Sequence, residues 1–122
     1  LYLDSSQTTY LVSIDAQTGI HSAISSIAGV QYVQTGTETI DEINDIYSFI
    51  ASDISGLVSK LYSVDLTLGT LISNPNFPNS SNMFDGIFNI KQDTLNNLIG
   101  IFDDDSSSTL SLVNIDRTNG VY

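Results

Sequence analysis

The chain has 122 residues, and its 14 acidic residues outnumber 3 basic ones, which gives a formal net charge of −11. So acidic a chain lacks the basic surface that binds a phosphate backbone, and anionic lipid repels it, so we expect no nucleic-acid partner and no membrane insertion. A hydrophobic fraction of 41% suffices for a core, and the absence of cysteine excludes disulfides and thiol chemistry.

The predicted elements are all strands, and they fall into three units. Residues 1–26 form a partial unit that opens with a strand at 1–3. Residues 27–73 form the second unit, whose first strand lies within 30–35. An acidic connector at 36–45 follows, and then come strands at 46–51, 61–65 and 70–73. Apolar and polar residues alternate, as in a half-buried strand, along residues 84–90 of the third unit.

A segment rich in Pro, Asn and Ser, residues 74–82, is the predicted linker to the third unit. That unit, residues 83–122, has predicted strands at 84–90, 98–102 and 110–115. A polar turn at 91–97 and a polar loop at 103–108 separate them, and a fourth strand starts at Val121. The first unit starts midway and the third stops early, so the chain is expected to be an excerpt or a subunit of something larger.

One short phrase recurs in all three units. It reads LVSID at 11–15, LYSVD at 61–65 and LVNID at 112–116, and a Gly follows each Asp by four positions. Residues 1–21 match residues 102–122 at 9 of 21 positions without a gap, where chance gives roughly one or two. A period of this size with four strands per unit is typical of β-propeller blades. The sequence therefore predicts an all-β chain of about two and a half four-stranded antiparallel blades, which is too few to close a ring.

The segments Phe84–Ile87, Leu98–Ile101 and 112–120 resemble repeats of bacterial β-propellers, in which an apolar strand half precedes a half ending in Ile-Asp and Thr-Gly. The relatives meant are the exported YVTN-like and quinoprotein-like propellers that have no enzymatic activity. This resemblance implies a binding or scaffold role. The chain has no Trp, and so it lacks the Trp-rich docking motifs of quinone-dependent dehydrogenases.

The Asp and Gly residues of the phrases are predicted to shape tight turns, because an Asp side chain accepts turn amides and Gly supplies a positive φ. These structural turn residues are Asp15, Gly19, Asp65, Gly69, Asp116 and Gly120. A catalytic role is not expected for them, since one such Asp per blade would be dispersed around a ring.

Other residues carry weaker indications of chemistry. Asp103, Asp104 and Asp105 form an oxygen-rich cluster that either is a solvated acidic loop or binds calcium, the one cofactor considered. His21, the only histidine, has no second ligand for zinc and no nucleophile-elbow serine. Tyr10 and Tyr32 are the aromatic candidates for an exposed protein or sugar contact. Asn79 and Thr94 fit glycosylation patterns.

These observations favour a non-enzymatic propeller module of an exported or cell-surface bacterial protein. Its expected partners are a protein, neighbouring blades, other copies of the chain, or a glycan. Two alternatives remain open: a repeat subunit of an extracellular filament or adhesin, and a fragment of a propeller enzyme whose catalytic residues lie elsewhere.

Overall fold

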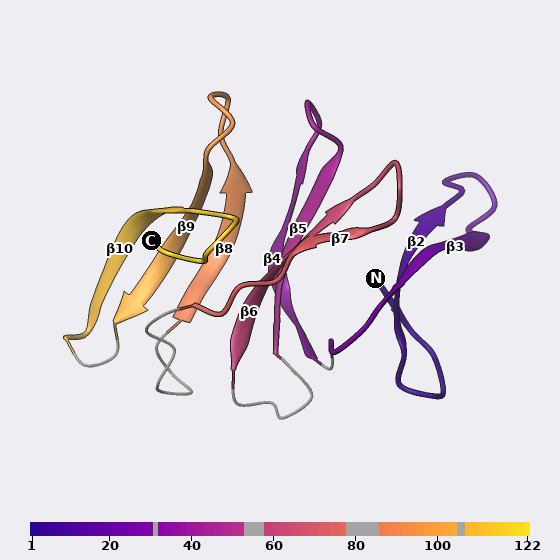
Figure 1. Cartoon of the computed structure of the whole chain (residues 1–122), viewed down its shortest axis with the longest axis horizontal. Coiled ribbons are helices and arrows are strands. Elements are labelled where there is room, and N and C mark those ends of the chain that lie inside the picture. The colour runs from indigo at the N-terminus through magenta and orange to yellow at the C-terminus, as the bar shows by residue number, and fades with distance from the viewer. Residues whose placement is uncertain (31, 53–57, 78–85, 105–106) are drawn as a thin grey trace.

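The computed structural model describes residues 1–30, 32–52, 58–77, 86–104 and 107–122. Over these residues the chain is all-β: ten strands form three antiparallel sheets, and no helix is present (Figure 1). The all-β prediction is confirmed. The described part of the chain has no helix that could cross a bilayer.

The three sheets follow one another in chain order. The first sheet holds β1 (Tyr2–Leu3), β2 (Thr9–Ile14) and β3 (His21–Ile27). The middle sheet holds β4 (Tyr32–Asp41), β5 (Ile46–Ser52), β6 (Ser59–Asp65) and β7 (Leu71–Ser73). The last sheet holds β8 (Gly86–Gln92), β9 (Leu98–Asp104) and β10 (Thr109–Ile115).

The strand β4 overturns one prediction, because it occupies most of the expected acidic connector. The predicted strand ended at residue 35, whereas β4 continues to Asp41 and pairs with β5. Thr37 and Asp41 lie buried within it, and the Thr37 hydroxyl donates to the carbonyl of Ile50 at 3.4 Å. Threonine suits a strand, but polar residues at buried positions conceal the alternation from which strands are predicted.

The predicted linker and the predicted last strand also differ in part from the structure. Residues 75–77 run beside β6, where the Leu61 amide donates to the Pro75 carbonyl at 3.1 Å; residues 78–82 lie outside the described chain. Val121 follows the last turn without forming a strand, so the last sheet has three strands.

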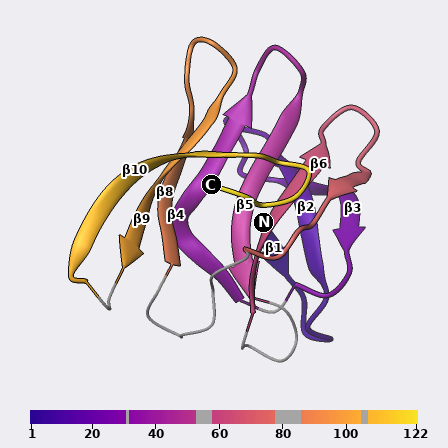
Figure 2. The same cartoon turned by 60° about the vertical axis from the view of Figure 1, so that its left-hand side comes forward.

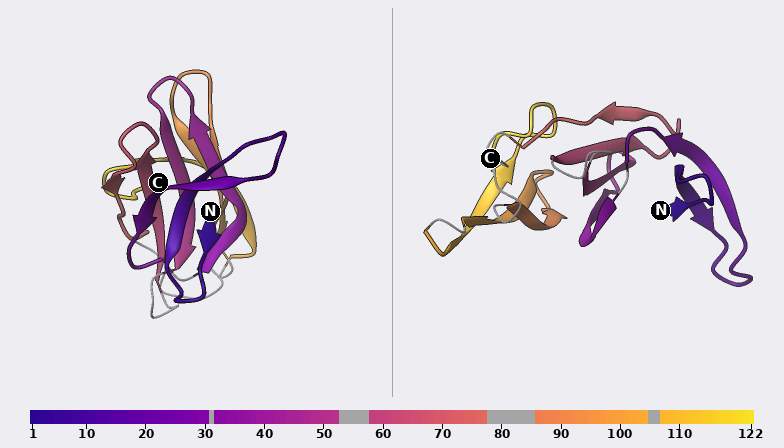
Figure 3. Two further views of the ribbon diagram at one scale, coloured as in Figure 1. Left: turned by 90° about the vertical axis from the view of Figure 1, so that its right-hand side faces the viewer. Right: turned by 90° about the horizontal axis from the view of Figure 1, so that it is seen from below.

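The sheets pack face to face along an arc, with the middle sheet between the other two (Figures 2 and 3). One apolar core joins the first and middle sheets, and a second joins the middle and last sheets. The first core contains Leu11, Ile27, Val30, Phe49, Ala51, Tyr62 and Val64. The second contains Ile50, Leu61, Phe77, Ile87, Ile90, Leu98 and Ile115. The middle sheet is therefore covered on both faces.

Alternation along β6 explains how one strand serves both cores. Tyr62 and Val64 point to the first sheet, and Leu61, which precedes Tyr62, points to the last sheet, because successive side chains in a strand face opposite ways. The Tyr62 ring stacks on Phe49 with centroids 5.2 Å apart, and its hydroxyl donates to the Gly29 carbonyl at 3.3 Å. These contacts tie the middle sheet to the segment that leaves the first.

The two cores predict unequal effects for two leucines at corresponding positions of the repeated phrase. Leu61 is 0% exposed and Leu112 is 75% exposed. Leu61→Ala opens a cavity, so we expect it to lower the free energy of unfolding by about 2–5 kcal/mol. Leu112→Ala, measured in dilute protein, is expected to change that free energy by less than about 0.5 kcal/mol. Urea unfolding followed by circular dichroism checks both values, and equal losses would contradict the assignment of the core.

Candidate functional site

The outer face of the last sheet is a row of exposed apolar side chains. In register across its three strands, Phe88 lies opposite Ile101, and Ile101 lies opposite Leu112. Residues directly opposite in antiparallel strands share one face. Leu110 lies two residues before Leu112 and therefore points the same way. Phe88, Leu110 and Leu112 are 39%, 71% and 75% exposed. We call the face formed by Phe88, Ile101, Leu110 and Leu112 the C-terminal face.

The outer face of the first sheet is the counterpart at the other end of the stack. Leu11 points into the core, so Tyr10 and Val12 on either side of it, and Ile14 beyond, point outward. Tyr2 pairs with Tyr10 across β1 and β2, with ring centroids 6.5 Å apart. Tyr2, Tyr10 and Val12 line a groove of about 340 Å³ together with Asp4, His21 and Ala23. We call the face formed by Tyr2, Tyr10, Val12 and Ile14 the N-terminal face.

Corresponding positions of the repeated phrase show what distinguishes these two faces from the interior. The fourth residue of the phrase is 0% exposed at Val64, buried at Ile115 and 65% exposed at Ile14. The first residue is buried at Leu11 and Leu61 and exposed at Leu112. Each position is buried where a sheet lies against it and exposed where none does among the described residues.

The glycines of the three Asp–Gly turns follow the same rule. A Cβ added to Gly69 would lie 3.1 Å from Ile24 in the first sheet, and one added to Gly120 would lie 2.6 Å from the Asn76 carbonyl oxygen. A Cβ at Gly19 would meet nothing within 4 Å. Each of the later two turns therefore packs closely on the end of the preceding sheet, whereas the first turn is open.

The hydrogen bonds within these turns are the same in all three. In each, the Asp amide donates to the carbonyl after the Gly at 2.9 Å, and the Gly amide donates to the Asp carbonyl at 2.8 Å. The Asp Oδ1 atom also accepts turn amides at 2.8–2.9 Å. The φ angles of Gly19, Gly69 and Gly120 are 70°, 67° and 73°, a region that glycine adopts without strain. The Asp residues are thus engaged in shaping the turns.

A polar network links the middle and last sheets. Asp41, at the end of β4, has a side chain that is 1% exposed, and Arg117 of the last turn donates from Nη1 to its Oδ2 at 3.2 Å. The Arg117 guanidinium also donates to the Gln92 side-chain oxygen. Asn44 donates from Nδ2 to Asp41 at 3.0 Å. Burial acts to raise the pKa of Asp41, but the hydrogen bonds from Asn44 and the charge of Arg117 outweigh it and hold that pKa below its ordinary value.

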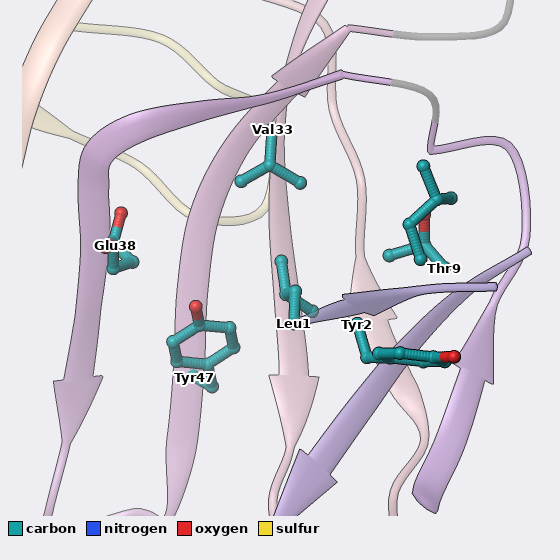
Figure 4. Close-up of a pocket in the computed structure, with 7 residues that line it drawn as sticks. Leu1, Tyr2, Thr9, Val33, Glu38 and Tyr47 are labelled. Carbon is teal, nitrogen blue, oxygen red and sulfur yellow. The ribbon is translucent and has the colours of Figure 1, made fainter. Parts of the chain in front are cut away.

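A cleft of about 340 Å³ lies between the first and middle sheets (Figure 4). Leu1 and Tyr2 line it from one side, and Val33, Glu38 and Tyr47 line it from the other. Burial, with a smaller contribution from the Glu38 charge, raises the pKa of Tyr47 to about 12. Tyr47 therefore stays protonated at neutral pH and can donate a hydrogen bond. Such a phenol beside a carboxylate is a lining that suits polar ligands.

The remaining predicted site residues are distributed over the three sheets, and Asp103 lies opposite Leu110 beside the C-terminal face. Asp103 and Asp104 are the last residues of β9, and the Ser107 hydroxyl donates to Asp104 at 2.7 Å; Asp105 lies outside the described residues. Within residues 1–30, 32–52, 58–77, 86–104 and 107–122, no three His, Asp or Glu residues gather in a group that could hold a metal ion.

Thr94 lies in the turn between β8 and β9, and Asn79 falls outside the described chain. His21 starts β3, and its ring lies 5.0 Å from that of Tyr2. Tyr10 contributes to the N-terminal face, and Tyr32 starts β4.

Of the residues that form the two outer faces, only Tyr10 was singled out from the sequence, as an aromatic candidate for an exposed contact. The position of Leu112 within the repeated phrase was the available signal. For the Asp41–Arg117 pair there was no signal, because 76 residues separate the partners. Comparison of the chain with protein-family models, with characterised proteins and with solved structures finds no match.

The ion pair between the middle and last sheets generates one prediction. Arg117→Met leaves the Asp41 carboxylate buried without its charged partner, so we expect it to lower the free energy of unfolding by about 3–5 kcal/mol. The double variant Asp41→Leu/Arg117→Met removes both charges and should lose less than the single variant does. Urea unfolding of both variants measures the difference. A double variant that is less stable than Arg117→Met would show that the pair is not the source of the effect.

The turn carboxylates generate a pH prediction. Hydrogen bonds hold the pKa values of Asp15, Asp93 and Asp116 below the ordinary 3.8, as Asn44 and Arg117 do for Asp41. A carboxyl group whose pKa is lower in the folded than in the unfolded state contributes stability that is complete above the unfolded value and is lost as the pH falls through the folded one.

The urea midpoint should therefore fall as the pH drops below about 4, and show little dependence on these groups between pH 6 and 7. Asp116→Asn, which keeps a side-chain acceptor in the turn, should reduce the size of this fall. A midpoint that rises with acid would contradict the assignment.

Proposed function

We propose that the chain is a non-enzymatic scaffold module, built from stacked sheets of the β-propeller blade type, that binds protein through its two outer faces. The observation that carries this proposal is the exposure of the repeated phrase. Leu11 and Leu61 are buried by the next sheet, and Leu112, at the same position, is 75% exposed. An apolar row of this kind on a sheet face marks an interaction surface.

The shared turn geometry supports the blade interpretation of the sheets. Three turns with the same hydrogen bonds follow the same phrase, and two of them pack on the end of the preceding sheet. Repeated units of this kind bury their apolar faces only by packing against neighbouring units. On this proposal the units are blades that need further neighbours, and the composition, poor in Lys and Arg, favours an exported bacterial protein.

A tandem extension tests whether the C-terminal face receives a further sheet. Residues 72–122 are repeated after Tyr122, because Tyr122 follows Gly120 as Leu71 follows Gly69. The added unit then follows the last sheet as the last follows the middle. If the added sheet covers the C-terminal face, Leu112→Ala in the extended chain should lower the free energy of unfolding by about 2–5 kcal/mol, as expected of a core leucine.

Leu95→Ala is the matched control, because Leu95 is 80% exposed in the turn between β8 and β9 and lies off the face. Its effect should stay below about 0.5 kcal/mol in both chains. A Leu112→Ala variant that remains neutral in the extended chain would show that the C-terminal face does not take a sheet of this type, and the proposal would be wrong.

A further inference from the structure

The two interfaces inside the chain are built from the same two kinds of face. At each, the earlier sheet presents the leucine that opens the phrase, Leu11 or Leu61. The later sheet presents the β-branched residue that precedes the Asp, Val64 or Ile115. At these two phrase positions the interfaces are therefore directional, with the leucine on the earlier sheet and the β-branched residue on the later one.

One outer face exposes the leucine position of the phrase, and the other exposes the β-branched position. The C-terminal face carries Leu112 at the position of Leu11 and Leu61, and the N-terminal face carries Ile14 at the position of Val64 and Ile115. We infer that the C-terminal face of one copy of the chain packs against the N-terminal face of a second copy, in a head-to-tail arrangement. This inference rests on the proposed function and names its partner.

The shapes of the two faces agree with this contact. The N-terminal face contains the groove lined by Tyr2, Tyr10 and Val12, and the C-terminal face projects Leu110 and Leu112, which are 71% and 75% exposed. An aromatic groove that receives aliphatic side chains is the usual core of a protein interface. The eight residues that define the two faces include no charged side chain. Asp103 lies opposite Leu110, and Asp4 lines the groove, so these two carboxylates must stay hydrated at the rim of the contact.

The open first turn supplies an independent argument for a further neighbour beside the N-terminal face. Gly69 packs on Ile24 of the first sheet, and Gly120 packs on Asn76 beyond β7. Gly19 has the same positive φ and hydrogen bonds but touches nothing within 4 Å. Ile24 and Asn76 both belong to the segment that follows the repeated phrase in the preceding sheet, and the Gly19 turn is open to a segment of that kind.

A heterologous contact of this kind adds copies one after another, and the assembly either closes into a ring or continues as a filament. The arc of the three sheets in Figure 3 favours a closed ring, and a straighter approach gives a filament. Both assemblies contain the same contact between a C-terminal and an N-terminal face, so either one supports the inference.

Two blocked variants test the direction of the contact. Leu112→Lys blocks the C-terminal face, and Ile14→Lys blocks the N-terminal face. Lysine also reduces the net charge of −11, so general repulsion cannot explain a loss of association. By sedimentation velocity over a wide concentration range, the unchanged chain should form particles larger than one chain, and each variant alone should remain a monomer.

An equimolar mixture of the two variants should form a one-to-one dimer and nothing larger, because one intact C-terminal face then meets one intact N-terminal face. The matched controls are Leu95→Lys and Ile43→Lys, at residues that are 80% and 79% exposed in turns. Both controls should assemble as the unchanged chain does.

Three results would overturn the inference: an unchanged chain that stays monomeric at every concentration, a single blocked variant that still dimerises with itself, or a mixture that does not associate. The first and third leave the proposed function standing if the tandem extension covers Leu112. If the extension also fails, the scaffold function falls with the inference.

Discussion

Every sheet of this protein has two apolar faces, and the need to cover both governs the rest of the structure. Burial of apolar surface contributes roughly 25 cal/mol per Å², and a sheet with one uncovered face forgoes much of that stabilisation. The middle sheet meets the requirement, since Phe49 toward the first sheet and Leu61 toward the last are both 0% exposed. The outer sheets meet it on one side only, as Ile14 and Leu112 show.

Apolar burial is not directional, so other contacts must set how one sheet lies on the next. The Asp41–Arg117 pair does this between the middle and last sheets, because its geometry is met at one register only. The turn glycines act in the same way through close approach, which admits no side chain at Gly69 or Gly120. The apolar cores therefore determine the order in which the sheets stack. The turn glycines and the ion pair determine how each sheet is aligned on the next.

This division explains what the sequence predicts and what it does not. Local signals, the alternation along residues 84–90 and the Asp–Gly phrase, predict strands and turns, since both depend on residues close in the chain. The full length of β4 was not predicted, because its buried positions include Thr37 and Asp41. Polar residues of this kind are typical of a connector between strands. Asp41 becomes acceptable in the interior only through Arg117, 76 residues away, and no local pattern carries that information.

Charge and apolar surface are separated in this chain, and the separation bears on how its outer faces avoid indiscriminate association. The turns after β2, β4, β6 and β8 lie at the same end of the stacked sheets (Figure 1). They carry the acidic residues Asp15, Glu42, Asp45, Asp65 and Asp93. The net charge of −11 opposes contact between two copies in any arrangement, and stacking in the register of the internal interfaces also brings these acidic ends side by side. Only an interface that buries enough apolar surface overcomes this repulsion. The repulsion therefore disfavours poorly fitted contacts between the outer faces.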